Sequence, residues 1–422
     1  MTRPSVRASV DPAAVPRAVR EVCAALQADG HGAWVVGGCV RDHLLGRAVS
    51  DWDLCTSATP RRVMKLFRRT VPTGIEHGTV TVFHDGEQCE VTTLRGDGAY
   101  TDGRRPDTVA FIADLGEDLA RRDFTVNAIA YDPIAETLSD PHGGLGDLRL
   151  GLLRAVGDPR TRFREDGLRV LRGARFTAAL GFDLEAATEA AIPEALDVFG
   201  KVSAERVREE WIKALKAHAP SRAFRVMART GILAVTLPAL DRVASDAEAW
   251  ERAMAALDTC PLPFTSRLGA LLHGVDVKVL DGWFRAGKFS NDERATVLRL
   301  VRFHDVTAVE GASDASLRRW LRDVGREAVG DVLDVAGAVR GVGLAELRAR
   351  VRAELDGGVP LAVNELAVDG NMLMAKLGMK PSRALGATLA GLLEDVLDDP
   401  SRNTPDALLD RARARIDAGA SG

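Results

Sequence analysis

The stretch Trp34-Val-Val-Gly-Gly-Cys-Val-Arg-Asp42 decides how the N-terminal part of this 422-residue chain folds. An apolar run ends at its two adjacent glycines, and apolar residues then recur at helical spacing. This order predicts a strand, a tight glycine turn and a helix. Adjacent glycines let the backbone approach a ligand closely, and the N-terminus of the helix presents unpaired N–H groups to an anion. We therefore expect Gly38 and Arg41 to lie beside a bound phosphate group.

Two aspartates follow this turn in the segment Asp51-Trp-Asp53. If the segment is a strand, both side chains point to one face, and neighbouring carboxylates repel each other unless a cation lies between them. Oxygen ligands of this kind suit Mg²⁺. Either motif alone is more often an ordinary turn or a solvated strand edge. Together, a phosphate-binding turn and a paired-carboxylate metal site indicate nucleotidyl transfer.

A β-hairpin is predicted over Thr79–Leu94, with its turn at Asp85-Gly86. Its second strand carries Glu90, which we expect in the strand next to the two aspartates. Glu90 is a candidate third catalytic carboxylate near the metal. A structural ion pair with an arginine is the alternative that the sequence leaves open.

A second group of polar residues lies in the stretch Leu119–Ala130, where Arg122, Asp123 and Asn127 can share one face if the stretch is helical. Such a group can be a satisfied network in the protein core. Beside a phosphate site, these side chains are better explained as ligands of a ribose and a triphosphate.

The stretch Phe163–Phe176 carries Asp166, Arg169, Arg172 and Arg175 at intervals of three residues, which predicts one polar helix face. A solvated basic face is the alternative, but apolar residues are interleaved with the arginines. An aspartate and an arginine one turn apart supply an acceptor and donors. These groups match the edge of cytosine or adenine and not that of guanine or uracil.

The overall composition is typical of a soluble globular protein, with 46% hydrophobic and 27% charged residues. No apolar run is long enough to span a membrane, and the N-terminus lacks the core of a signal peptide. The five cysteines form no C-x-x-C pair, so we expect reduced thiols in a cytoplasmic protein. The net charge of −4 means that any RNA-binding surface must be local.

We expect an α+β chain in which a mixed β-sheet is confined to the N-terminal part and helices make up the rest. The segment Arg95–Pro106 is rich in glycine and predicts a mobile loop, after which Val109–Ile112 predicts another strand. The predicted domains are a catalytic head over 12–155, neck helices with the base-reading helix over 156–220, a helical body over 221–310 and a helical tail over 311–422.

These motifs resemble those of the class II CCA-adding tRNA nucleotidyltransferases and bacterial poly(A) polymerases, within the DNA polymerase β nucleotidyltransferase superfamily. The glycine turn with Asp51-Trp-Asp53 is similar to the catalytic motif of that family. The stretch Arg121–Ala128 resembles its ribose and triphosphate motif, and Glu165-Asp166 with Arg169 resembles its amino-acid template for the base. Glu205-Arg206 with Glu209 resembles the neck motif that follows.

The resemblance implies a head with a mixed five-stranded sheet and the addition of C, C and A to the 3′ end of tRNA from CTP and ATP. It assigns two Mg²⁺ ions to Asp51 and Asp53. It also assigns Arg172 and Arg175 to phosphate binding or stacking, and the tail to tRNA. The loop is expected to reshape the site between C and A addition.

Three other functions remain open from the sequence: addition of only CC or only A, poly(A) polymerisation, and RNA binding without catalysis. Thr73–Val80 and Asn127-Ala128 resemble the CCA-adding members and not the poly(A) polymerases, and a silent protein would be expected to have lost Asp51 or Asp53. The chain departs from relatives at Gly167, where proline is preferred. His273 lacks the following aspartate of a metal phosphohydrolase motif, and we expect His304 at the surface.

Overall fold

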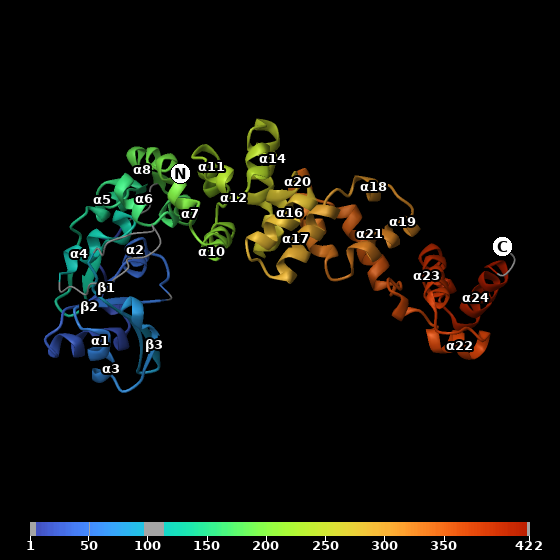
Figure 1. Ribbon diagram of the computed structural model, residues 1–422, viewed down its shortest axis with the longest axis horizontal. Coiled ribbons are helices and arrows are strands. Elements are labelled where there is room, and N and C mark those ends of the chain that lie inside the picture. The colour runs from blue at the N-terminus through green and yellow to red at the C-terminus, as the bar shows by residue number, and fades with distance from the viewer. Residues whose placement is uncertain (1–5, 50, 97–113, 420–422) are drawn as a thin grey trace. The chain divides into compact units, whose positions relative to one another are not determined.

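The computed structural model describes residues 6–49, 51–96 and 114–419 (Figure 1). The chain divides into two compact units, Met1–Asp241 and Arg242–Gly422, and each is described by itself. The first unit contains a mixed sheet and helices, whereas the second is helical throughout its described residues, so the α+β prediction is confirmed. Most of the predicted loop over 95–106 and the predicted strand over 109–112 lie outside the described residues.

The sheet of the first unit has seven strands in the order β3-β4-β5-β2-β1-β6-β7. Strands β2 and β5 are parallel and the other neighbours are antiparallel. The sheet has two strands more than the resemblance implied, because short hairpins extend both of its edges. The strands are β1 (Ala33–Val36), β2 (Asp53–Thr56), β3 (Thr70–Gly74), β4 (Thr79–His84), β5 (Glu87–Thr93), β6 (Ala130–Asp132) and β7 (Thr137–Ser139).

The predicted strand, glycine turn and helix are confirmed at β1 and α2 (Gly38–Leu44). Gly37 lies between them with φ +82°, a conformation that is costly for residues with a side chain. On one face of the sheet, α1 (Arg17–Ala28) and α3 (Pro60–Leu66) pack against β4 and β5. The strands supply fully buried apolar side chains to this face, among them Val80, Val82, Cys89 and Val91.

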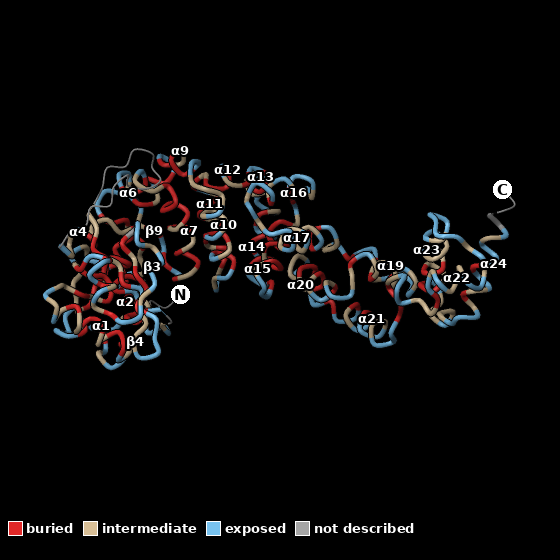
Figure 2. Tube along the Cα trace, turned by 60° about the horizontal axis from the view of Figure 1, so that its bottom comes forward, coloured by how far each residue is buried: buried red, intermediate tan, exposed pale blue. Residues whose placement is uncertain are grey.

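The rest of the first unit is mostly helical, and Figure 2 shows α7 as one of its most buried segments. A small two-stranded parallel sheet of β8 (Leu152–Leu153) and β9 (Asp183–Leu184) lies among these helices. The α-helices are α4 (Leu115–Ala120), α5 (Gly144–Leu150), α6 (Pro159–Glu165), α7 (Leu168–Leu180), α8 (Ala186–Ala190), α9 (Leu196–Phe199), α10 (Ala204–Leu215), α11 (Ser221–Arg229) and α12 (Ile232–Thr236); α13 (Pro238–Ala244) crosses the boundary between the units.

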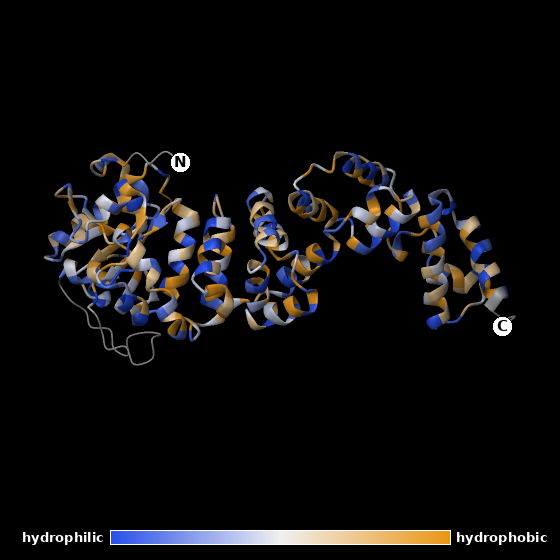
Figure 3. Cartoon of the chain, turned by 90° about the horizontal axis from the view of Figure 1, so that it is seen from above, coloured by the Kyte–Doolittle hydropathy of each residue, from blue (hydrophilic) through white to orange (hydrophobic). Residues whose placement is uncertain are grey.

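The described part of the second unit is built from amphipathic helices, which carry hydrophobic and hydrophilic segments side by side in Figure 3. One core cluster includes Leu300, Leu321 and Val332, and another, near the C-terminus, includes Leu373 and Leu392. The helices after α13 are α14 (Ala247–Thr259), α15 (Phe264–Leu272), α16 (Val277–Ala286), α17 (Asn291–Phe303), α18 (Thr307–Glu310), α19 (Asp314–Val324), α20 (Val329–Arg340), α21 (Ala345–Asp356), α22 (Gly370–Leu377), α23 (Arg383–Asp398) and α24 (Pro405–Gly419).

His304 was expected at the surface and is only partly exposed, whereas the following Asp305 is exposed. Helices α15 and α17 pack together, and His304 at the end of α17 is half-buried against His273 at the end of α15, with 5.5 Å between the ring centroids. Within the described residues, no three His, Cys, Asp or Glu side chains are grouped so that they could hold a metal ion. Searched over the same residues, no helix has the length and apolarity needed to cross a membrane.

Candidate nucleotide-binding and catalytic site

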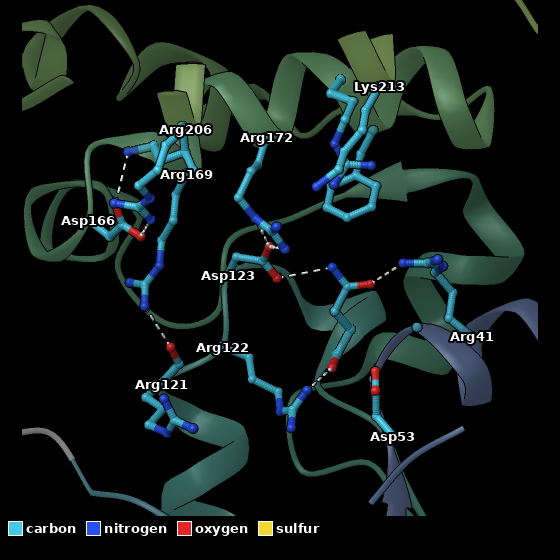
Figure 4. A pocket seen from close by; sticks show the side chains of 16 residues that line it. Arg41, Asp53, Arg121, Arg122, Asp123, Asp166, Arg169, Arg172, Arg206 and Lys213 are labelled. Carbon is cyan, nitrogen blue, oxygen red and sulfur yellow. Dashed lines mark hydrogen bonds and ion pairs between the residues drawn. The ribbon is translucent and has the colours of Figure 1, made fainter. Parts of the chain in front are cut away.

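A cavity of about 580 Å³ lies in the first unit, between the edge of the head sheet and helices α7 and α10 (Figure 4). We call its two ends the Asp53 end and the Asp166 end after the carboxylates that mark them. Among the lining side chains are eight arginines and lysines but only three aspartates, so the cavity suits a polyanion. The lining residues are Gly37, Gly38, Arg41, Asp53, Arg121, Arg122, Asp123, Asn127, Asp166, Leu168, Arg169, Arg172, Arg175, Phe176, Arg206 and Lys213.

The glycine turn is part of the wall, as the sequence predicted. Gly38 is the first residue of α2, and Arg41 follows in its first turn with its guanidinium at the cavity. A Cβ atom on Gly37 would lie 2.8 Å from a terminal nitrogen of Arg122, so a side chain at this position would displace that guanidinium. Arg41 is held in place by a two-bond contact with the carboxylate of Asp42, at 3.0 and 2.8 Å.

The first residue of β2 is Asp53, and it lies in register with Glu90 of the parallel strand β5. The predicted position of Glu90 in the neighbouring strand is therefore confirmed. Asp51 precedes the strand and does not line the cavity, so the prediction that both aspartates occupy one strand is wrong. Between them, the ring of Trp52 is buried near His43 of α2, with 6.5 Å between centroids, and this anchors the chain before the strand begins.

The electrostatic surroundings of Asp53 are short of positive charge. The pKa of its carboxyl is raised above the usual range by partial desolvation at the base of the cavity and by the nearby carboxylates of Glu90 and Asp51. The guanidinium of Arg122 opposes this shift without cancelling it. A group of oxygen donors in this state gains stability when a cation binds.

Arg122, Asp123 and Asn127 do not share a helix face, so that prediction is wrong. Helix α4 ends at Ala120, and the carboxylate of Asp123 accepts a hydrogen bond from the backbone N–H of Phe124 at 2.8 Å. Such a local hydrogen bond competes with continuation of a helix. A separate 3₁₀ turn over Thr125–Asn127 then brings Asn127 back to the cavity.

All three residues nevertheless line the cavity, where Arg122 and Asp123 are labelled in Figure 4, and Arg122 donates to the backbone oxygen of Asn127 at 3.4 Å. The amide nitrogen of Asn127 donates to Asp123 at 3.0 Å, and its oxygen accepts a hydrogen bond from Arg41. Arg172 of α7 donates to the other oxygen of Asp123 at 2.8 and 2.5 Å. Burial alone would raise the pKa of Asp123, but the charge of Arg172 and the hydrogen bonds from Asn127, Arg172 and Phe124 outweigh burial and hold that pKa far below its usual range.

At the other end, Asp166 lies between α6 and α7 and is not part of α7, so the prediction of one continuous helix face is wrong for this residue. Its backbone is extended, and its carboxylate accepts a hydrogen bond from the backbone N–H of Leu168 at 3.1 Å, a local contact typical of the residues before a helix. The arginines at positions 169, 172 and 175 do lie on α7 and line the cavity, as predicted.

The charged groups at the Asp166 end are paired with each other. Asp166 accepts a hydrogen bond from Arg206 of α10 at 2.7 Å. Arg169 donates to the carboxylate of Glu165 at 2.6 Å and to the backbone oxygen of Arg121 at 2.8 Å. Both candidate base-reading groups are thus fixed before any ligand is bound. A carboxylate accepts several hydrogen bonds, so Asp166 retains acceptor capacity toward a ligand.

Two residues of α10, Glu210 and Lys213, contribute to the site without having been predicted from the sequence. Glu210 is 3% exposed and pairs with Arg175, while Lys213 contacts it at 3.4 Å and lines the cavity. On α7, Phe176 lies under the guanidinium of Arg175, whose central carbon is 3.7 Å from the ring centroid. The charge pattern of α10 was visible in the sequence, but only tertiary packing shows which of its charges face the arginines of α7.

Comparisons with known proteins agree with this geometry. Residues 33–154 match the family described as poly A polymerase head domain, and residues 181–243 match one described as a probable RNA- and SrmB-binding site of polymerase A. The fold and the site thus define a nucleotidyltransferase of the poly A polymerase head class.

Relatives that match over most of the chain identify the family more closely. The chain is 36% identical to the CCA-adding enzyme of Lactobacillus helveticus over 91% of its own length and 93% of the relative. The crystal structure of the Bacillus stearothermophilus CCA-adding enzyme in complex with CTP matches with a TM-score of 0.80 and 30% identity, over 95% of this chain and 98% of that one. The chain belongs to the family of CCA-adding enzymes, and the resemblance inferred from its motifs is confirmed.

A third relative shares the fold at lower identity. The Thermotoga maritima CCA-adding enzyme complexed with tRNA matches with a TM-score of 0.65 and 19% identity, over 97% of each chain. Solved structures of these relatives thus contain CTP in one case and tRNA in the other, the two kinds of substrate that the sequence motifs predicted.

Proposed function

We propose that this chain adds C, C and A to the 3′ end of tRNA, using CTP and ATP and releasing pyrophosphate. The observation that carries the proposal is the cavity itself. A carboxylate short of positive charge lies at one end, an Asp–Arg pair suited to a base edge lies at the other, and cationic side chains line the space between them.

The reaction joins the terminal 3′ oxygen of the tRNA to the α-phosphorus of the nucleotide. The bond from that phosphorus to the oxygen bridging to the β-phosphate breaks, pyrophosphate leaves, and the proton of the 3′ hydroxyl is released. The catalytic carboxylates in this proposal are Asp51 and Asp53, with Glu90 beside them as a third.

The residues present fit Mg²⁺, because this ion is commonly held by one or two carboxylates together with water and substrate phosphates. The raised pKa of Asp53 supports a cation site there. Asp51 and Asp53 would hold the ion or ions, which activate the 3′ hydroxyl and neutralise the charge of the triphosphate and the leaving pyrophosphate. The family is typically metal-dependent, and the choice of Mg²⁺ is part of the proposal.

The triphosphate is assigned to Gly38, Arg41 and Arg122, which surround the N-terminus of α2. Asp123 and Asn127 are assigned to the ribose side of the cavity, where their contacts with Arg41 and Arg172 connect the phosphate and base regions. Arg172 and Arg175 remain assigned to phosphate binding or stacking.

Base selection is assigned to Asp166 and Arg169. The carboxylate of Asp166 accepts from the exocyclic amine of cytosine or adenine, and Arg169 donates to a ring nitrogen. Uracil and guanine present an oxygen where the amine is required, so both would leave Asp166 facing another acceptor. Because the protein already orients both side chains, the base can be selected without a nucleic-acid template.

The four domain ranges given above remain proposals, with the tail over 311–422 assigned to tRNA binding, and the enzyme is proposed to be cytoplasmic. The loop over 95–106 remains our candidate for the change between C and A addition. A complete loop favours full CCA addition over the alternatives of CC alone or A alone. Poly(A) polymerase is a further alternative.

These alternatives separate in one experiment. Purified protein is incubated with tRNA lacking zero, one, two or three terminal nucleotides, and CTP and ATP are offered separately and together. The proposal predicts CTP incorporation on ends lacking two or three nucleotides, ATP incorporation on the end lacking one, and no extension of the complete end. Repeated ATP addition would indicate a poly(A) polymerase, and absence of either C or A addition would indicate a partial enzyme.

A further inference from the structure

The strand face that carries Asp53 continues beyond the cavity toward the edge strand β3. In neighbouring strands, residues directly opposite each other point to the same face of the sheet. Asp53 of β2 is opposite Glu90 of β5, and Glu90 is opposite Thr81 of β4. These three side chains therefore form one row across the sheet, and β3 follows at a distance of about 14 Å, or three strand spacings, from β2.

This face differs from the opposite one in its chemistry. The opposite face of β4 and β5 is apolar and is covered by α1 and α3. On the face of Asp53, Glu90 is exposed and the positions beyond it carry hydroxyl groups. A row of polar side chains on a sheet face beside a catalytic carboxylate is available to a polar ligand.

Two pairs of threonine hydroxyls lie on this face. Thr73 of β3 and Thr81 of β4 are 2.8 Å apart at their oxygens, and Thr79 of β4 and Thr92 of β5 are 3.1 Å apart. Thr73 is exposed, whereas Thr81 is only 1% exposed and serves to orient it. Next to them Val71, which pairs with Thr81, is 44% exposed and offers an apolar contact for a sugar or a base.

The geometry of the reaction indicates that the second substrate, the RNA end, approaches Asp53 from the side of Glu90 and the threonines. In an in-line displacement the attacking and leaving oxygens lie on opposite sides of the phosphorus. The cavity extends from Asp53 toward α7 and α10, and its lining includes Asp53 but not Glu90 or the threonines. When a nucleotide occupies the cavity, the other side of Asp53, which faces Glu90 and Thr81, is therefore available to the RNA whose 3′ hydroxyl attacks.

From this geometry we infer that the row from Glu90 to Thr73, which we call the threonine track, binds the ribose groups at the 3′ end of the RNA being extended. A threonine hydroxyl both donates and accepts, and so does the 2′ hydroxyl by which proteins distinguish RNA from DNA. The threonine track is thus a positioning element that selects a ribonucleotide end. The inference rests on the proposed function, since it assumes that an RNA end is extended at Asp53.

The test uses tRNA ending in CC, with ATP as the nucleotide, and two matched substrates that carry 2′-deoxycytidine at the last or the next-to-last position. Wild-type protein should prefer the ribose substrate over at least one deoxy substrate by about tenfold in kcat/KM, the effect of one lost hydrogen bond. Thr73→Val keeps the shape of an edge-strand residue without the hydroxyl. It should lower kcat/KM for the ribose substrate to the value for that deoxy substrate, through KM for tRNA, and leave KM for ATP unchanged.

Two further variants serve as controls. Thr73→Ser restores the hydroxyl and should restore the preference for ribose. Thr137→Val makes the same change at an exposed position on the opposite edge strand, β7, and should behave as wild type. Equal activity of wild type on all three substrates, or equal losses in Thr73→Val on ribose and deoxy ends, would overturn the inference while the proposed function stands. Inactivity of wild-type protein on every tRNA end would overturn both.

Discussion

The two ends of the cavity balance their charges in opposite ways. At the Asp166 end, each carboxylate is matched by an arginine within the protein, as in the pairs Asp166–Arg206 and Glu165–Arg169. At the Asp53 end, carboxylates gather and raise the pKa of Asp53 above its usual range. The carboxylates at the Asp166 end are therefore paired without a ligand, whereas those at the Asp53 end are the ones that we propose to bind a cation. We infer that the Asp166 end selects the base of the nucleotide and that the Asp53 end accelerates the transfer reaction.

The largest expected effect follows from removing the carboxylate at the Asp53 end. Asp53→Ala should lower nucleotide incorporation by several orders of magnitude, because a ligand of the catalytic metal is lost. The fold should persist, since the side chain is exposed and contributes little to packing. Incorporation of labelled CTP into tRNA and circular dichroism measure the two properties. Glu87→Ala removes an exposed carboxylate at the start of β5 and is the matched control, with turnover expected near that of wild type.

A smaller effect, on selectivity, is expected at the other end. Asp166→Ala removes the acceptor for the exocyclic amine, so discrimination against UTP and GTP should fall by about 10- to 100-fold. Competition between labelled CTP and UTP on tRNA lacking two nucleotides measures the ratio. Asp197→Ala removes an exposed carboxylate of α9 that does not line the cavity, and it should preserve selectivity. Unchanged discrimination in Asp166→Ala would show that the base is read elsewhere.

The contrast between the ends also explains what the sequence could predict. The turn at Gly37 and Gly38, the hairpin and the position of Glu90 beside Asp53 follow from local rules: a glycine pair, a turn signal and the alternation of a strand. The side chains near Asp53 were recognised because they lie on or beside short regular elements. Asp51 is the exception, because it precedes the first residue of the strand.

The Asp166 end was predicted less well because its contacts join distant segments. Arg172 contacts Asp123 across 49 residues, Arg206 contacts Asp166 across 40, and Glu210 contacts Arg175 across 35. The spacing of residues within one helix cannot predict contacts between segments that lie so far apart in the sequence. Spacing identified the arginines of α7 as a group, but only the packing of α10 and of the turn after α4 shows which carboxylates fix them.

A moderate effect on stability is expected midway along the cavity. Asp123→Ala removes the nearer of the two buried carboxylates that pair with Arg172 and should lower the free energy of unfolding by roughly 3 kcal/mol at pH 7. Because the folded pKa of Asp123 lies below the unfolded value of 3.8, its stabilising contribution is present above pH 4 and declines as the pH falls further. Urea unfolding of both proteins at pH 7 and below pH 4 should show the difference shrinking in acid. A constant difference would contradict the ion pair as its source.

The smallest expected effect is at the Asp53 end, where the contribution of the carboxyl group to stability depends on pH in the opposite direction from that of Asp123. The folded pKa of Asp53 is raised, so its contribution to stability is present below the unfolded pKa and is lost as the pH rises through the folded pKa. At pH 7 with a chelator, Asp53→Asn should therefore melt at or slightly above the temperature of wild type. In the proposed function Asp53 is a ligand of Mg²⁺, so the ion should raise the melting temperature of wild type by a few degrees, but not that of the variant. Equal shifts in both proteins would place the ion at another site, and a variant that melts well below wild type in the chelator would show that Asp53 is structural.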